Sequence, residues 1–386
     1  MALGEWLRQV MVETSALTHR ASSVARLMAS RQLVALKIQS ASHTVLLVER
    51  ASLRPDFLFL AGSRPKVTEL FRGNAVDLVL QRSRLKLEAD GADVVAAPWK
   101  FFEERPDTLR WYPFLDAGLP VAASLEEQIA RVPFPPHQKL LRAVALDPAI
   151  KLRVSRARKD FERFYSELYL PYQNGTHGHV DEKQSLKDGF LEGGALALVE
   201  GRGKGLLAGA LLLTRRRGIL TYHRSGFADV ASLTPTQLSH RTAALELLVF
   251  RHAQQLGMAM LDFGIAPSVL THPLFVHKRR LGCSFLPTPS SPALMLKVTD
   301  ALRPSLFARA PLLTGEPGAF VVQAGSSRAG KVSSKSLGTL VREFDVEGCQ
   351  RVGLTTDAAA DLPGRVLLER ALLEEVPRLR VDVREV

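Results

Sequence analysis

The order of elements is decided between residues 206 and 285, where the chain reads LLAGALLLTRRRGILTYHRSGF (206–227), GMAMLDFG (257–264) and FVHKRRLGCSF (275–285). In the first stretch, two apolar runs flank TRRRG, which predicts two strands joined by a tight turn. Another apolar run at 194–200 ends in the glycine-rich sequence GRGKG. We expect a strand and a hairpin turn there, because a phosphate-binding loop would end in GK[ST] and precede a helix.

A long helix should follow these strands. Leucine and valine recur at helical spacing between 238 and 256, Gly257 stands where a C-terminal cap belongs, and Thr234 or Thr236 can cap the start. MAMLDFG then predicts a short buried strand, residues 268–282 a second, broken helix, and CSFLPTP a closing strand. Residues 193–287 are thus predicted to run strand, strand, strand, loop, helix, strand, helix, strand.

The flanking regions also predict an α/β protein. Short apolar runs at 32–38, 43–49, 56–62, 94–102 and 118–124 suggest strands. We expect helices at 66–73, 137–146, 160–172, 293–307, 334–344 and 366–377, and strands at 151–157, 318–325, 351–356 and 379–386. We therefore place an N-terminal α/β domain at 1–148, a second domain at 149–290 and a C-terminal α/β extension at 291–386.

Composition limits the classes of function. The 386 residues carry a formal charge of +12, which favours an anionic partner such as a nucleic acid or a phosphorylated cofactor, or else a dispersed solvated surface. The basic stretch from Lys151 to Lys159 alternates on and around a predicted strand, and it either contacts phosphates or forms a solvated strand edge. Two cysteines exclude a disulfide framework, and no apolar window reaches the length of a membrane span. We expect a cytoplasmic protein without a membrane span.

The central segment resembles the GNAT acyltransferase fold, and within it the FemAB-like and BioF2-like (CelD-type) branch. The resemblance lies in LLAGALLL, LTYHRSGF, ALELLVFRHAQQLG, LDFG and HKRRLG, with His277 where the family more often has Phe or Tyr. It covers about a quarter of the chain strongly and none of the last ninety residues. The resemblance implies a mixed-sheet α/β fold, two GNAT-like halves with the C-terminal extension added, and an acyltransferase activity.

The resemblance also implies where the chemistry occurs. In the GNAT fold the central strand splays from its neighbour and exposes backbone N–H groups to the acyl carbonyl. Here that strand is 219–224. Tyr222 and His223 alternate on it, so one should face the cleft and the other the opposite layer. His223 is a candidate general base or else a structural residue, and Tyr222 a candidate proton donor to the leaving group or else a core residue. Asp262 is a candidate base that orients the amine, although it can instead cap an Asx turn through Gly264.

We expect the donor to contact Lys278, Arg279 and Arg280, which suit a pyrophosphate or a tRNA end, together with Ser225 and Gly226. A solvated helix end explains the basic cluster nearly as well. His272 and His277 have no carboxylate or cysteine at ligand spacing, so no metal is expected. The loop before the long helix, ASLTPTQLSHRTA, lacks the glycines of a pyrophosphate loop, which weakens the acetyl-CoA interpretation.

The sequence hypothesis is an acyltransferase of the N-acyl or aminoacyl type. It would move its group from a CoA thioester, a carrier-protein thioester or an aminoacyl-tRNA to a small-molecule or peptide amine by direct attack, without a covalently bound cofactor. Two alternatives stay open: a basic RNA-binding protein without catalysis, and an interaction protein on a degenerate GNAT scaffold.

Overall fold

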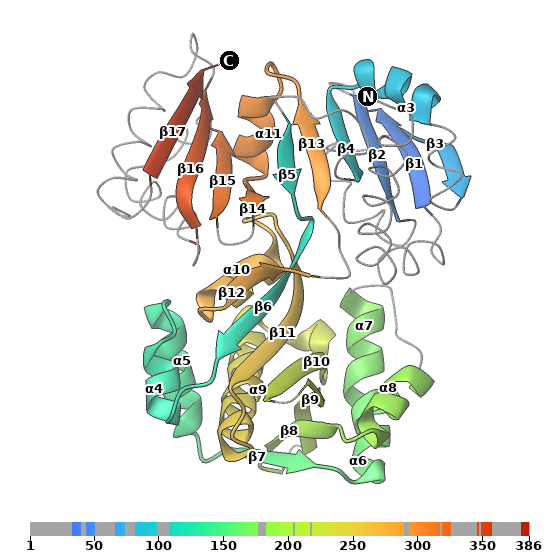
Figure 1. The fold of residues 1–386 in the computed structure, drawn as a ribbon. Coiled ribbons are helices and arrows are strands. Elements are labelled where there is room, and N and C mark those ends of the chain that lie inside the picture. Colours follow the sequence, from blue (N-terminus) through green and yellow to red (C-terminus); the bar gives the residue numbers. More distant parts are fainter. Residues whose placement is uncertain are drawn as a thin grey trace, which may run out of the picture. The chain divides into compact units, whose positions relative to one another are not determined.

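The structure is a computed structural model (Figure 1), and the chain falls into two compact units. It describes residues 33–39, 44–50, 66–73, 82–98, 108–176, 183–203, 205–216, 218–288, 293–316, 319–325, 346, 349–356 and 380–385. Unit 1 comprises Met1–Pro113, Pro289–Asp345 and Cys349–Val386, and unit 2 comprises Phe114–Thr288 and Val346–Gly348. Each unit is built on one mixed sheet, which confirms the predicted α/β class.

Unit 1 contains a ten-stranded sheet in the order β17-β16-β15-β14-β5-β13-β4-β2-β1-β3. Its strands are β1 (Leu33–Gln39), β2 (Thr44–Arg50), β3 (Lys66–Gly73), β4 (Val94–Pro98), β5 (Leu109–Trp111), β13 (Leu294–Val298), β14 (Leu312–Glu316), β15 (Ala319–Gly325), β16 (Cys349–Thr356) and β17 (Arg380–Glu385). The helices described in unit 1 are α3 (Arg82–Asp90) and α11 (Arg303–Arg309). The C-terminal strands thus extend the sheet of the N-terminal strands.

Two expected helices of unit 1 differ from the structure. Residues 66–73 form β3, which pairs with β1 at one end of the sheet, and residues 294–298 form β13, which inserts between β4 and β5. In both cases sheet pairing outweighs a short apolar spacing that also fits a helix. The predictions for 56–62, 334–344 and 366–377 lie outside the described residues.

Unit 2 contains a seven-stranded sheet in the order β12-β6-β11-β10-β9-β8-β7. Its elements are β6 (Phe114–Pro120), α4 (Leu125–Ala130), α5 (Pro135–Ala145), β7 (Ile150–Ser155), α6 (Arg158–Arg163), η2 (Phe164–Tyr169, a π-helix), α7 (Leu170–Thr176), α8 (Lys183–Leu191), β8 (Ala195–Gly201), β9 (Gly205–Arg216), β10 (Ile219–Phe227), η3 (Val230–Ser232), α9 (Pro235–Gln255), β11 (Met260–Pro267), α10 (Pro273–Arg280) and β12 (Ser284–Pro287). The element order predicted for 193–287 is confirmed.

Local signals explain most of this order. The GRGKG turn joins β8 to β9, with Gly201 paired to Gly205, so the hairpin interpretation is confirmed. Helix α9 begins with a capping box in which Thr234 and Gln237 satisfy one another's backbone N–H groups. Gly257 after the helix has a φ of 61°, the left-handed conformation of a helix terminator.

The boundary between the units lies earlier than the expected 148/149. Strand β6 pairs antiparallel with both β11 and β12, so residues 114–148 belong to the sheet of unit 2. Strand β7 is the outermost strand at the other end, which matches the solvated-edge interpretation of the basic stretch. Its Arg153 is already ion-paired with Asp160 and Glu200.

Helices cover both faces of the seven-stranded sheet. Helix α9 packs along β7 to β11, and α5 packs on α9. On the opposite face, Phe161, Phe164 and Leu168 form a core with Leu198 and Leu211. Figure 1 shows α4 and α5 on one side of this sheet and α6 to α8 on the other.

The π-helix η2 approaches the sheet at two glycines. A Cβ on Gly226 of β10 would lie 2.5 Å from the backbone of Leu168 and Tyr169, and a Cβ on Gly209 of β9 would lie 2.8 Å from the Phe164 ring. Gly209 and Gly226 are paired in register. Glycine is therefore required here to let the backbone of η2 lie against the sheet.

Candidate active site in unit 2

Strands β10 and β11 part in the middle of the sheet. They pair in parallel over three residue pairs only, from Ile219↔Met260 to Thr221↔Asp262. Beyond this point β10 continues along β9 to Phe227, while β11 continues along β6 to Pro267. The splay expected from the family resemblance is thus present between 222–227 and 263–267.

A bulge in β10 decides which side chains face α9. Tyr222 pairs with Leu212, but Arg224 pairs with the adjacent Leu211, so His223 is the additional residue of the bulge. Leu211 belongs to the core under η2, so its neighbour Leu212 faces the opposite side of the sheet. Tyr222 pairs with Leu212 and therefore points to that side, toward α9. The expected simple alternation of Tyr222 and His223 is therefore interrupted by the bulge.

Tyr222 lies at the opening of the two strands. Its ring stacks on Phe263 of β11, with ring centroids 5.7 Å apart, and so bridges the opening. Burial raises the pKa of Tyr222 well above its ordinary value, against a hydrogen bond with Ser225, and the nearby Glu246 charge raises it further. Tyr222 is therefore protonated at neutral pH and can serve as a proton donor.

Asp262 uses both of its carboxylate oxygens within the strands. Oδ1 accepts a hydrogen bond from the backbone N–H of Gly264 at 2.7 Å, and Oδ2 accepts one from the Thr221 hydroxyl at 3.1 Å. Gly264 has a φ of 71° and lies where the β11–β6 register shifts. The Asx-turn interpretation of Asp262 is confirmed, and its oxygens hold the bend of β11.

Lys278 supports the same bend from α10. The side chain is buried, and its Nζ donates to the carbonyl oxygens of Gly264 at 2.9 Å and Ile265 at 2.6 Å. Burial lowers the pKa of Lys278 to about 8, although the thiol of Cys283 and the carboxylates of Asp262 and Asp116 oppose this change. The amine is thus near its titration range at neutral pH.

The other expected donor contacts lie in different places. The Arg280 guanidinium stacks over the Phe134 ring, 4.6 Å from its centroid. Arg279 and His223 are partly buried, and Gly226 is buried beneath η2. The structure therefore places Tyr222 beside Ser225 and Phe263, and Asp262 and Lys278 at the bend of β11. It assigns a packing role to Gly226 and places Arg280 at a separate cavity.

The sequence analysis did not single out Glu246, a buried acidic residue of α9. Glu246 of α9 is almost completely buried, and its carboxylate contacts His137 of α5 and His277 of α10. The available signal was a glutamate inside the apolar run ALELLVF, on the buried face of a helix. Its partners lie 109 residues upstream and, by sequence numbers, 31 residues downstream, so the sequence could not pair them.

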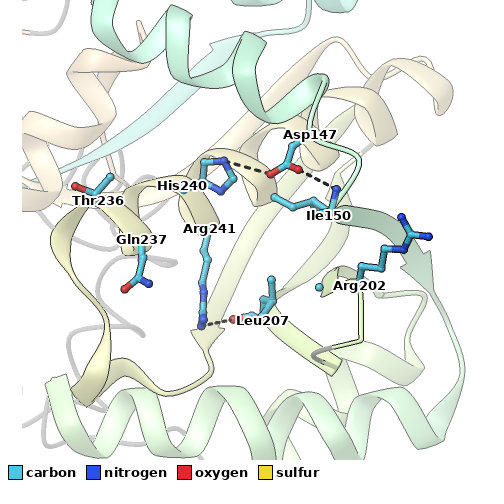
Figure 2. Close-up of a pocket in the computed structure, with 10 residues that line it drawn as sticks. Asp147, Ile150, Arg202, Leu207, Thr236, Gln237, His240 and Arg241 are labelled. Atoms are coloured by element: carbon cyan, nitrogen blue, oxygen red, sulfur yellow. Dashed lines mark hydrogen bonds and ion pairs between the residues drawn. The ribbon is translucent and has the colours of Figure 1, made fainter.

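A cavity of about 360 Å³ lies where the first turns of α9 meet the start of β7 and the β8–β9 hairpin. Figure 2 shows His240 of α9 pointing at Asp147, with Nε2 and Oδ2 3.7 Å apart. Arg241 extends past them and donates to the Leu207 carbonyl at 3.1 Å and to the Ala228 carbonyl at 2.6 Å. Arg241 thus ties the helix start to the sheet.

The described residues contain neither a metal-ligand cluster nor a helix suited to cross a membrane. No group of three or more His, Cys, Asp or Glu side chains in the described ranges is arranged to hold a metal ion. Among the helices that the structure describes, none has the length and apolar character needed to cross a bilayer.

Comparisons with solved structures find similar chains at low sequence identity. FemX matches over 69% of this chain and 88% of its own length, with 11% identity and a TM-score of 0.38. The L-PGS structure from Bacillus licheniformis matches over 70% and 83%, with 11% identity and a TM-score of 0.34. A GCN5-related N-acetyltransferase from Kribbella flavida matches over 84% and 72%, with 11% identity and a TM-score of 0.25.

The FemAB-like and GNAT groups that the sequence resembles are therefore among the structural neighbours. No protein-family model and no curated protein sequence matches the chain. Each TM-score lies under one half, so the function proposed below rests on the strand geometry of unit 2.

Proposed function

We propose that unit 2 is an acyltransferase that moves an acyl or aminoacyl group from a thioester or a tRNA ester to an amine. The observation that carries this proposal is the opening between β10 and β11 after Thr221↔Asp262. Past that pair, β10 and β11 no longer hydrogen-bond to each other, although each stays paired with its other neighbour in the sheet. Backbone N–H groups at such an opening can donate hydrogen bonds to a carbonyl oxygen.

An opening of this kind suits acyl transfer because negative charge develops on the carbonyl oxygen during attack. Fixed backbone N–H groups stabilise that charge without having to reorganise. The capping contacts of Asp262 and the two hydrogen bonds of Lys278 hold β11 in its bend, so the opening is preformed. We assign Asp262 and Lys278 as positioning residues on this basis.

Tyr222 is the proposed catalytic residue. It lies at the opening, its burial keeps the hydroxyl protonated, and Ser225 hydrogen-bonds to it. The phenol can donate its proton to the departing thiolate or ribose oxygen. A neutral amine attacks the carbonyl carbon, the C–N bond forms, the C–S or C–O bond of the donor breaks, and the proton lost by the attacking nitrogen replaces the one that Tyr222 gave to the leaving group.

The start of α9 bears on the choice of donor. Its first turn contains Pro235, which has no N–H group, and the capping box of Thr234 and Gln237 uses two more. Few N–H groups remain for a pyrophosphate. This supports a donor held elsewhere, such as an aminoacyl-tRNA, a carrier thioester or a CoA bound differently, with Arg279 as a proposed contact.

The test begins with a thermal-shift screen of the full chain against acyl-CoA esters, an acyl-carrier thioester and charged tRNA, followed by a transfer assay with the stabilising donor. Tyr222→Phe should lower the transfer rate about a hundredfold. Tyr165→Phe, on η2 and stacked on Phe161, is the matched control and should leave the rate unchanged. Stabilisation by no donor and the absence of transfer would contradict the proposal. Salt-sensitive binding of uncharged RNA would then favour the RNA-binding alternative.

A further inference from the structure

Three helices of unit 2 meet at one buried carboxylate. The Glu246 side chain on α9 is 2% exposed, with Oε2 2.7 Å from Nε2 of His137 and Oε1 3.0 Å from Nε2 of His277. An ionised carboxylate only accepts hydrogen bonds, so Nε2 of His137, which is hydrogen-bonded to Oε2, carries a proton. Nε2 of His277 lies close to Oε1 without an aligned hydrogen bond.

The charge state of this cluster follows from its contacts. Burial opposes ionisation of Glu246, but hydrogen bonds and charge from His137 and His277 outweigh it and hold its pKa below the usual value. Oε1 is not aligned for a hydrogen bond with any described residue despite its proximity to His277, so that side of the carboxylate is not saturated.

A cavity of about 380 Å³ lies against this cluster, a volume within the usual range for small ligands. It is lined by Phe134, Pro136, His137, Leu140, Leu238, Ser239, Thr242, His277 and Arg280. The His277 side chain is 41% exposed and that of His137 is 15% exposed, so His277 is the more accessible imidazole.

The lining combines polar and apolar side chains. The Arg280 guanidinium is held over the face of Phe134, and in that position its N–H edge remains available for a carboxylate. His277, beside Glu246, offers a ring nitrogen as a hydrogen-bond acceptor, while Leu140 and Leu238 offer apolar contact. This set matches a molecule that carries an anionic group, an amine and an apolar side chain.

We propose that this cavity binds an amino-carboxylate, with the carboxylate on Arg280 and the amino group at His277. The ligand's ammonium group donates a hydrogen bond to a His277 ring nitrogen, and the nearby Glu246 carboxylate favours its positive charge.

The test measures binding without any acyl donor, so its failure is distinguishable from failure of the transfer activity. Full-length protein with isotope-labelled histidine rings is titrated in the millimolar range with L-leucine, isopentylamine (no carboxylate) and isocaproate (no amine). The His277 ring signals are assigned by their loss in His277→Gln. L-leucine should shift them saturably, and each partial probe should bind at least tenfold more weakly.

The variants test the carboxylate contact separately from the amino-group contact. Arg280→Gln should weaken L-leucine binding about tenfold and leave isopentylamine unchanged, whereas Lys139→Gln, an exposed basic residue of α5 outside the lining, should change neither. The proposal is overturned if L-leucine gives no saturable shift, if isopentylamine binds equally well, or if Arg280→Gln has no effect. Arg280 is exposed, so this last variant is expected to fold.

Discussion

Gly226→Ala tests whether this glycine contacts a donor, as the family resemblance implies, or serves only to admit η2. An added Cβ would lie 2.5 Å from the Leu168 carbonyl carbon and the Tyr169 nitrogen, and 2.6 Å from the Leu168 oxygen. All three are backbone atoms, so no side chain can rotate away. Normal contact begins near 3.4 Å, so η2 or β10 must move by about 1 Å.

Displacements of this kind in a packed interior cost about 1 to 3 kcal/mol. For a unit of this size the loss corresponds to a Tm decrease of about 3 to 10 °C. The assay is thermal and urea unfolding followed by circular dichroism, together with acyl transfer per folded molecule below the transition. Gly175→Ala in α7 is the control, because a Cβ there meets nothing within 4 Å.

We expect Gly226→Ala to lose stability and retain transfer per folded molecule, and Gly175→Ala to be neutral or slightly stabilised by its helix propensity. An unchanged unfolding curve for Gly226→Ala would refute the packing argument. A normal Tm with abolished transfer would instead restore Gly226 to the donor site.

Three further predictions concern stability. Arg153 holds the pKa of Asp160 at about 2, so the ionised Asp160 stabilises the fold above about pH 4, and this stabilisation is lost as the pH falls toward 2. Asp160→Asn should therefore lower the free energy of unfolding by about 1 to 2 kcal/mol at neutral pH and by less in acid, measured by urea unfolding. Burial lowers the pKa of Lys278 to about 8, so between about pH 8 and 10 the unfolded state binds one proton more than the folded state. The stability of the wild type relative to Lys278→Met should therefore rise as the pH increases over that window. A difference that does not change with pH would contradict the assignment. Thr234→Ala removes one acceptor of the capping box with Gln237 and should cost about 1 kcal/mol in the same assay, and no loss would show that the cap is not needed.

The sequence predicted unit 2 from 193 to 287 because its signals are local. Apolar alternation, the glycines of the hairpin and the Thr234 cap each act within a few residues, and no distant partner is needed to interpret them. The residues around Asp262 illustrate the same point, since the Asx turn to Gly264 spans only two positions.

Long-range pairing explains what the sequence missed. Leu115, Ala117 and Leu119 alternate as in any strand, and nothing local shows that β6 inserts between β11 and β12. Residues 66–73 fit a helical spacing, but pairing with β1 makes them a strand. Likewise, Glu246 acquires its meaning from histidines on two other helices.

The outermost strand β7 gives part of the chain's basic charge a protective role. Among the described strands it pairs with β8 alone, and such an edge can add a strand from another molecule. Lys151 on this edge is 74% exposed, and Arg153 is held beside it by Asp160 and Glu200. Two copies approaching edge to edge would bring like charges and bulky, fixed side chains together. The basic strand therefore opposes self-association through the sheet.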